Sequence, residues 1–163
     1  MIYILVCSVN LNSAIDNCYS TVTVEGAGGS GGLVGGSSSG SSVSSSYCTG
    51  SVTDSGGDSG GFLGLNNSST VSNCYCRGSV TRTGGDYQFG GFCGNAVSGT
   101  IEYCYSTGSV ASAGTSKGFA GDGGSTSFTS NFWDSEASNQ TRATGATART
   151  TEPPAMARSR TML

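Results

Sequence analysis

The apolar positions of the chain fall in short segments that recur at a nearly constant interval, and glycine- and serine-rich stretches separate them. One ten-residue segment begins at Ile15, Val43, Val71 and Ile101, so that successive copies start 28, 28 and 30 residues apart. All four copies have tyrosine in their fifth position and valine in their tenth. A fixed period of this length is typical of a solenoid or a propeller array.

A second short apolar segment, with two glycines before a Leu or Phe, lies between the copies. It occurs at 31–35, 60–64 and 90–94, and a weaker version occurs at 117–121. The distance from this segment to the next copy is almost constant, whereas the stretch that leads into it varies from 7 to 10 residues. Length variation on one side only predicts stacked turns with one tolerant loop.

The same register extends to both ends of the chain. Cys7 falls in the column of Cys93, and Phe128 begins a fifth copy. We therefore expect the chain to begin in mid-repeat and its natural start to lie upstream of Met1. The apolar run at 2–6 is too short for a secretory signal and lacks a basic region before it, so we interpret it as a strand. No segment approaches the ~20 apolar residues of a membrane span.

The recurring segments are rich in β-branched and aromatic residues, and they are too short for helices. One repeat cannot bury its own apolar face, so each strand is expected to pair with its equivalent one coil away, at ~4.8 Å. The predicted fold is an all-β, parallel β-solenoid (β-helix) of about four to five coils. The predicted core ladders are Ile15/Val43/Val71/Ile101, Val24/Val52/Val80/Val110, Leu33/Phe62/Phe92/Phe119 and Cys18/Cys74/Cys104.

Alternation along a strand assigns the side chains of each copy to two faces. In the first copy it places Cys18, Val22 and Val24 on one face and Tyr19 on the other. We predict that the Cys and Val face points inward and the Tyr face outward. Ile15 has the wrong parity for the inner face, so a bend or bulge is expected between it and Cys18, where Asn and Ser tolerate such turns.

The pattern Ile-x-Asn-Cys-Tyr-Ser-Thr-Gly-Ser-Val, followed by Gly-Gly-Leu-Val-Gly, resembles the GLUG repeat of bacterial surface proteins. These include adhesin-like proteins and some immunoglobulin A peptidases, in which the repeat forms accessory arrays. The resemblance covers residues 4–136. It implies a solenoid repeat array at 1–136, with a partial coil at 1–14 and a closing segment at 128–136.

The tail at 137–163 departs from the closing stretch of that family. It contains four of the seven basic residues, namely Arg142, Arg149, Arg158 and Arg160. A basic tail can bind an acidic partner. Because this one has so few apolar residues, we predict instead that it is disordered.

The seven cysteines fall in three columns, which are Cys18/Cys74/Cys104, Cys48/Cys76 and Cys7/Cys93. We interpret them as small apolar residues that fill a narrow interior. Disulfides between adjacent coils are allowed by the coil spacing, but an odd count argues against a disulfide framework. A zinc site has less support, because the chain has neither histidine nor paired Cys-x-x-Cys motifs.

Signatures of catalysis are present but incomplete. Residues 57–61 read Gly-Asp-Ser-Gly-Gly, the nucleophile motif of trypsin-like proteases, yet without histidine no Ser-His-Asp triad can form. Asp54, Asp58 and Asp86 fall in the variable loops, where they could hold Ca²⁺ or serve a polysaccharide-cleaving enzyme. We interpret them as solvated loop acids. The sequence thus predicts no enzyme, no catalytic residue, no metal and no cofactor.

The best functional candidate is the column of Tyr19, Tyr47, Tyr75 and Tyr105. An outward file of rings could stack on sugars or contact a protein partner, and the alternative is ring stacking that only stiffens the array. The net charge of −3 gives no support for nucleic-acid binding. Open coil ends are expected to favour self-association.

These observations predict a non-catalytic repeat module of a secreted or cell-surface protein, with a role in structural display or adhesion. Possible partners are a surface glycan, a host protein or a neighbouring protein. The alternative is an accessory carbohydrate-binding or spacer module of a larger secreted enzyme, such as a peptidase.

Overall fold

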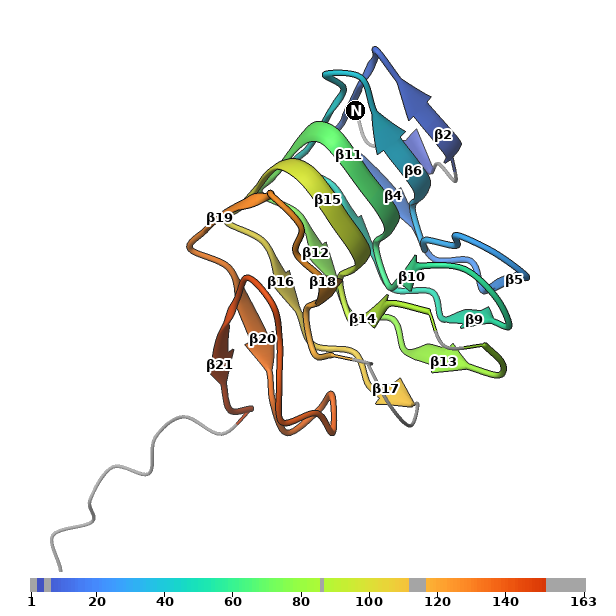
Figure 1. The fold of residues 1–163 in the computed structure, drawn as a ribbon, viewed down its shortest axis with the longest axis vertical. Coiled ribbons are helices and arrows are strands. Elements are labelled where there is room, and N and C mark those ends of the chain that lie inside the picture. Colours follow the sequence, from blue (N-terminus) through green and yellow to red (C-terminus); the bar gives the residue numbers. More distant parts are fainter. Residues whose placement is uncertain (1–2, 5–6, 86, 112–116, 152–163) are drawn as a thin grey trace, which may run out of the picture.

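The chain winds into stacked coils of short β-strands (Figure 1), and the coils enclose a narrow apolar core. The computed structural model describes residues 3–4, 7–85, 87–111 and 117–151, and within these ranges the α-helix is absent. Every pair of strands in every sheet is parallel, and each strand pairs with its equivalent in the turn before or after. The predicted parallel β-solenoid is confirmed, with about four turns.

The fifth position of each copy lies on a seven-stranded sheet, called here the tyrosine sheet. Its strands, in spatial order, are β1 (Tyr3–Ile4), β4 (Cys18–Ser20), β8 (Tyr47–Cys48), β12 (Tyr75–Cys76), β16 (Tyr105–Ser106), β20 (Phe132–Asp134) and β21 (Thr147–Arg149). The backbone register pairs Tyr19 with Tyr47, Tyr47 with Tyr75 and Tyr75 with Tyr105. Like residues therefore lie over like, as the fixed period predicts.

An eight-stranded sheet forms the second face of the solenoid. It contains β2 (Cys7–Leu11), β3 (Ala14–Asp16), β6 (Val34–Ser38), β7 (Ser42–Ser44), β11 (Leu63–Ser72), β15 (Cys93–Glu102), β18 (Ala120–Asp122) and β19 (Ser127–Thr129). In the two central turns the second apolar segment and the start of the next copy join in one bent strand, β11 or β15. The register between them shifts near Asn67, so the bend is accommodated by a bulge.

Two smaller sheets complete each turn on the side of the variable loops, at the right of Figure 1. The four-stranded sheet contains β5 (Val24–Gly26), β9 (Val52–Asp54), β13 (Val80–Arg82) and β17 (Val110–Ala111), and the two-stranded sheet contains β10 (Ser59–Gly60) and β14 (Phe89–Gly90). Most of the variation in repeat length falls on this side. A further one-residue difference is accommodated by the register shift near Asn67 in the eight-stranded sheet.

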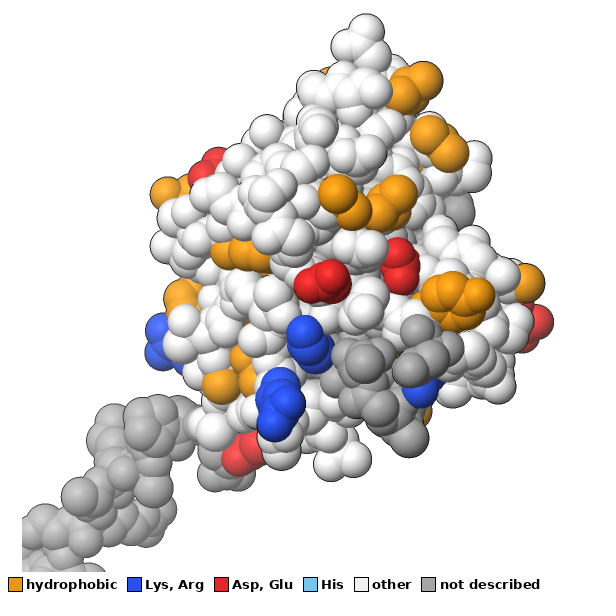
Figure 2. Space-filling model, viewed as in Figure 1, with side chains coloured by type: hydrophobic (Ala, Val, Ile, Leu, Met, Phe, Trp, Pro, Cys, Tyr) orange, Lys and Arg blue, Asp and Glu red, His pale blue; other side chains and the backbone are white. Residues whose placement is uncertain are grey.

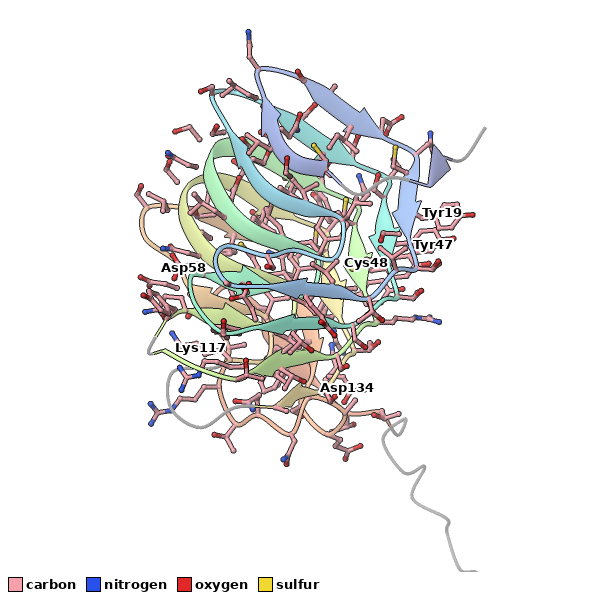
Figure 3. The ribbon with its side chains drawn as sticks, turned by 90° about the vertical axis from the view of Figure 1, so that its right-hand side faces the viewer. Tyr19, Tyr47, Cys48, Asp58, Lys117 and Asp134 are labelled. Atoms are coloured by element: carbon pink, nitrogen blue, oxygen red, sulfur yellow. The ribbon has the colours of Figure 1, made fainter. Side chains whose placement is uncertain are left out.

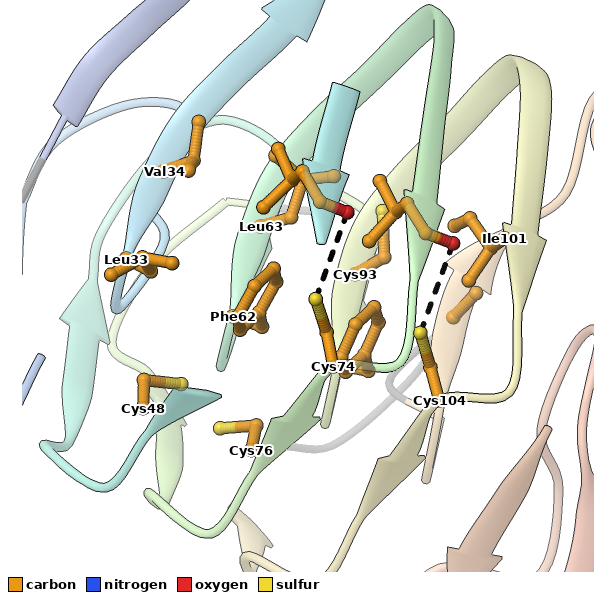
Figure 4. Packing of buried hydrophobic residues seen from close by; sticks show 14 of the residues in the cluster. Leu33, Val34, Cys48, Phe62, Leu63, Cys74, Cys76, Cys93, Ile101 and Cys104 are labelled. Atoms are coloured by element: carbon orange, nitrogen blue, oxygen red, sulfur yellow. Dashed lines mark hydrogen bonds between the residues drawn. The ribbon is translucent and has the colours of Figure 1, made fainter. Parts of the chain in front are cut away.

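The interior is filled by ladders of identical or similar side chains (Figure 4). The rings of Phe62 and Phe92 stack at 4.8 Å and those of Phe92 and Phe119 at 4.9 Å, and all three are fully buried. Every residue of the predicted core ladders is buried except Val24, which is half-buried. Val24 lies on β5, the edge strand of its sheet, so no strand covers it on the N-terminal side.

Val22 was predicted to point inward, and this is wrong, since 43% of its surface is exposed. Strand β4 ends at Ser20, so the alternation of faces does not extend to Val22. The next copy has Gly50 in this column, and a Cβ added there would lie 1.8 Å from the carbonyl oxygen of Val22. Backbones of successive turns approach closely here, which leaves no interior space for a side chain.

The predicted bend near the start of each copy is present in every turn. Residues in its third position have positive φ, with values of 53° at Asn17, 49° at Ser45, 53° at Asn73 and 53° at Tyr103. This left-handed conformation is accessible to Asn at the lowest cost among non-glycine residues. The bend restores the parity of the strand, so that Ile15 and Cys18 are both buried.

The solenoid extends beyond residue 136, where the sequence was expected to become disordered. Strand β21 pairs with β20, and it aligns Phe132 with Thr147 and Asp134 with Arg149. The prediction missed this strand because Thr147–Arg149 is fully exposed and so lacks the apolar alternation of the other strands. The remaining part of the predicted tail, residues 152–163, lies outside the described residues.

Candidate functional site

The four tyrosines of the predicted stripe form one continuous stack on the outer face of the tyrosine sheet. Ring centroids are 5.3 Å apart for Tyr19 and Tyr47 and 4.9 Å apart for the next two pairs, with interplanar angles between 2° and 13°. Each side chain is half-buried. Figure 3 shows Tyr19 and Tyr47 pointing away from the solenoid. We call this surface the tyrosine stripe.

The rings are held by the sheet below them rather than by a loop. Alternate residues of the same strands point inward, and Cys18, Cys48 and Cys76 are buried. Because the residues before and after each tyrosine are buried, its backbone is fixed and its ring has little freedom to move. The stripe is therefore a preorganised flat surface, which reduces the entropy lost when a partner binds.

A cation lies beside the centre of the stripe. The guanidinium of Arg77 lies 5.5 Å from the centroid of the Tyr75 ring. Desolvation raises the pKa of Tyr75, the neighbouring tyrosines Tyr105 and Tyr47 raise it further, and Arg77 opposes this shift. Tyr75 therefore keeps its phenolic proton across the physiological range, and its hydroxyl can donate a hydrogen bond.

A second column of polar side chains runs alongside the rings, two positions further along each strand. It contains Thr21, Thr49 and Arg77, which are exposed, and Thr107, which is half-buried. Hydroxyl groups next to aromatic faces are the combination that binds sugars, whose rings have both apolar and hydroxyl-bearing surfaces. This column was not singled out by the sequence, although it repeats in phase with the tyrosines.

The stripe continues into the closing segment with a change of chemistry. Phe132 takes the place of tyrosine in register with Tyr105, and the guanidinium of Arg149 lies 4.5 Å from the Phe132 ring centroid. Trp133 points to the interior and is 4% exposed. Sequence reasoning assigned no role to Arg149, because the pairing of β21 with β20 was not predicted.

Asp54 is buried and not solvated as expected, whereas Asp58 is half-buried. Asp54 is fully buried, accepts a hydrogen bond from the Ser30 hydroxyl, and accepts another from the Gly56 amide at 2.8 Å. Asp58 accepts from the Gln88 amide at 3.0 Å and from the Asn95 side chain at 2.7 Å. These two carboxylates tie neighbouring turns together. Asp86 lies outside the described residues.

The described residues that the sequence singled out for a metal or protease site take structural roles. Within the described ranges, no group of three or more Cys, Asp or Glu side chains is arranged to hold a metal ion. Ser59, the serine of the protease-like motif, is fully buried and accepts a hydrogen bond from the Ser30 amide at 3.0 Å. Its hydroxyl is thus a structural acceptor between two turns.

All seven cysteines are free thiols, and six of them are buried. The Cys48 thiol donates to the Gly61 carbonyl at 2.9 Å, and the Cys104 thiol donates to the Glu102 carbonyl at 3.1 Å. Burial raises the pKa of Cys93 to about 12. Buried, protonated thiols are poor nucleophiles and poor metal ligands, so the geometry fits the interpretation of the cysteines as core residues.

The stacked turns and the external ring ladder define a repeat protein of the β-solenoid class. A family model of the GLUG motif matches residues 85–111, and the chain thus carries the GLUG motif that its sequence pattern resembles. The matched residues contain β14 to β17, one turn of the stack. Searches of curated proteins and of solved structures gave no match. In the described part of the chain, no helix has the length and apolar character needed to cross a membrane.

Proposed function

We propose that this chain is a non-catalytic repeat module of a secreted or cell-surface protein and that its role is structural display and adhesion. The observation that carries the proposal is the tyrosine stripe, in which the same half-exposed ring recurs in four successive turns. The GLUG motif at 85–111 supports a repeat module. A rigid array of equivalent side chains offers several weak contacts at once, and linked weak contacts give high avidity.

The distribution of chemistry along the turn fits this role. The inner columns consist of Phe, Val, Ile and Cys, which only pack, and the buried acids hold one turn to the next. The buried thiols and carboxylates therefore serve packing and contacts between turns. The side chains that repeat on the surface are aromatic rings and hydroxyls. We infer that the surface recognises a partner and does not transform it.

The proposal is tested by removing rings from the stripe and measuring adhesion. Beads that display the chain are assayed on a glycan array and on cell monolayers, and Tyr75→Ala and Tyr105→Ala are compared with the parent. We expect each variant to lose about fivefold or more in binding, because removing an aromatic contact that carries binding energy costs about 1 kcal/mol or more.

Tyr87→Ala is the matched control, since Tyr87 is 47% exposed and lies in a variable loop away from the stripe. Unchanged binding in both stripe variants, or an equal loss in the control, would contradict an adhesive role for the stripe.

A second candidate function is an accessory carbohydrate-binding or spacer module of a larger secreted enzyme such as a peptidase. The hydroxyl column beside the rings favours it, because Thr21, Thr49 and Thr107 are placed to bond sugar hydroxyls. Sequencing the complete reading frame distinguishes the two. A histidine-containing catalytic domain on the same chain supports the enzyme accessory, and further repeats behind a secretion signal support the display module.

A further inference from the structure

The tyrosine stripe ends in a pocket that shares Tyr105 with the stripe and Thr107 with the column of hydroxyl groups beside it. This terminal pocket has a volume of about 350 Å³ and lies where β16, β20 and β21 meet. Its lining includes Tyr105, Thr107, Phe132, Asp134, Arg149 and Thr151. It therefore combines aromatic rings, hydroxyl groups and one residue of each charge.

The pocket lies at the point where the ring stack stops. Rings stack from Tyr19 to Tyr105, yet among the described residues Tyr105 and Phe132 do not form a stacked pair, although their backbones are in register. Instead the Phe132 ring packs against the guanidinium of Arg149. The two aromatic side chains thus line the pocket without filling it, and they leave room for a flat ligand.

The two charged residues of the pocket are not equivalent. Asp134 is 9% exposed, and its Oδ1 accepts from the amides of Glu136 and Ala137 at 3.0 and 2.9 Å. Its Oδ2 accepts from the Thr151 hydroxyl at 2.6 Å. Both oxygens are therefore engaged within the protein, and Asp134 holds Thr151 in the pocket wall.

Arg149 is exposed, and its guanidinium carbon lies 4.5 Å from the centroid of the Phe132 ring. A guanidinium stacked on a ring keeps its N–H groups in the plane of the ring edge, where they can form two parallel hydrogen bonds with a carboxylate. Arg149 is thus the exposed charged group of the pocket, beside an Asp134 carboxylate whose two oxygens are hydrogen-bonded within the protein.

We propose that the terminal pocket binds a sugar residue that bears a carboxylate, such as a uronic acid at a glycan end. The apolar C–H face of the sugar would lie against Tyr105 and Phe132, the carboxylate would pair with Arg149, and the hydroxyls would bond Thr107. The volume suits one or two sugar rings, since ligand pockets begin at about 300 Å³. The pocket shares Tyr105 with the stripe, but Tyr75 does not line it, so a variant at Tyr75 tests adhesion by the stripe without changing the pocket lining.

The test measures binding of a uronic-acid trisaccharide and of the same trisaccharide with its carboxyl groups reduced to alcohols. Isothermal titration calorimetry measures both affinities, because the side chain of the single tryptophan, Trp133, points to the interior and is only 4% exposed. We expect the acidic trisaccharide to bind at least about tenfold more tightly than the reduced one, the difference expected for one charged bidentate pair.

Arg149→Gln removes the charge, and Arg142→Gln is the matched control, because Arg142 is also exposed and does not line the pocket. We expect about a tenfold loss of affinity for the acidic trisaccharide in the first variant and no change in the second. Arg149→Lys keeps the charge but not the two-pronged geometry, and it should bind with intermediate affinity. The emission of Trp133 without ligand shows whether each variant keeps the pocket folded.

Three outcomes would overturn the proposal. They are equal binding of the acidic and reduced trisaccharides, equal loss in the two Arg→Gln variants, and tighter binding of a glutamate-rich peptide that depends on Arg149. The last outcome would assign the pocket to a protein carboxylate. A Tyr75→Ala variant should bind the acidic trisaccharide as the parent does, so failure of the stripe and failure of the pocket are distinguishable.

Discussion

At the scale of single residues, the third position of each copy decides where the strand bends. Asn17 and Asn73 adopt positive φ with a residue type suited to it, whereas Tyr103 has φ of 53° with a bulky side chain that is 55% exposed. A left-handed conformation costs a bulky L-residue about 1–2 kcal/mol, and Asn reduces this cost. Tyr103 therefore adds this backbone strain to the folded state, although its side chain stays largely exposed.

We predict that Tyr103→Asn stabilises the protein by about 0.5–1 kcal/mol, because it relieves backbone strain and removes little buried surface. Chemical denaturation of the variant and the parent measures the difference. Asn73→Tyr is the reciprocal change and should destabilise by a similar amount. A lower free energy of unfolding in Tyr103→Asn would show that the tyrosine ring is needed where it lies.

The buried thiols make the free energy of unfolding depend on pH in the alkaline range. The pKa of Cys93 rises from 9.0 to about 12 because of its burial, so the unfolded thiol ionises first. Ionisation then favours the unfolded state, and the contribution of Cys93 is complete below pH 9 and is lost as the pH rises towards 12.

We expect the free energy of unfolding to fall steadily above pH 9, and Cys93→Ala to fall less steeply than the parent. Urea denaturation at a series of pH values under reducing conditions measures both slopes. Identical slopes in the variant and the parent would mean that the Cys93 thiol ionises equally well in the folded state.

At the scale of elements, successive turns are joined where glycine lets their backbones approach. A Cβ added to Gly61 would lie 2.3 Å from the Gly91 carbonyl oxygen and 2.5 Å from the Cys76 sulfur. Gly36, on β6 and in register with Leu65, has open space where its Cβ would lie. The close approach of the backbones thus requires glycine at position 61, whereas a larger residue would also fit at position 36.

We predict that Gly61→Ala destabilises the protein by about 2–4 kcal/mol, because the clash is with backbone that cannot move without displacing the next turn. Gly36→Ala should be neutral or stabilising by up to about 1 kcal/mol, since it only restricts the unfolded chain. Thermal unfolding of both variants tests the contrast. Equal melting temperatures would show that the corner can open.

At the scale of the whole molecule, the two ends of the stack differ. At the C-terminal end, β21 pairs with β20, and Thr144 forms a bridge with Ala120 beside β18. At the N-terminal end, β2 is the edge of the eight-stranded sheet, and Val9 and Leu11 are 60% and 58% exposed. Open strand edges with apolar side chains recruit other chains, so self-association through this end stays a prediction.

The double change of Val9→Lys and Leu11→Lys should reduce self-association, because charges on an edge strand oppose pairing. Val97→Lys is the control, since Val97 is 40% exposed but lies on the interior strand β15. Sedimentation velocity over a range of concentrations gives the oligomeric state. A parent that is monomeric throughout, or an equal effect of the control, would contradict the role of this edge.

The sequence was enough to predict the features that recur in every turn, but not the features that occur in a single turn. The columns of Tyr47 and Phe92 follow from the period, because a stack places like residues over like. The burial of Asp54 could not be predicted, since it depends on the Ser30 hydroxyl of the preceding turn and on Gly26, which leaves room for it. The terminal pocket depends on Arg149, whose strand has no repeat signature.

The in-phase ladders have a consequence for how such a gene can change. Excising residues 43–70 would remove one rung and bring Tyr19 beside Tyr75 and Val24 beside Val80, in columns that already match. Unequal crossing-over between repeats would thus lengthen or shorten the rod in steps of ~4.8 Å without creating an unfamiliar junction. The reach of the molecule is then free to vary, while the pairing of β21 with β20 and the surface that the solenoid exposes stay the same.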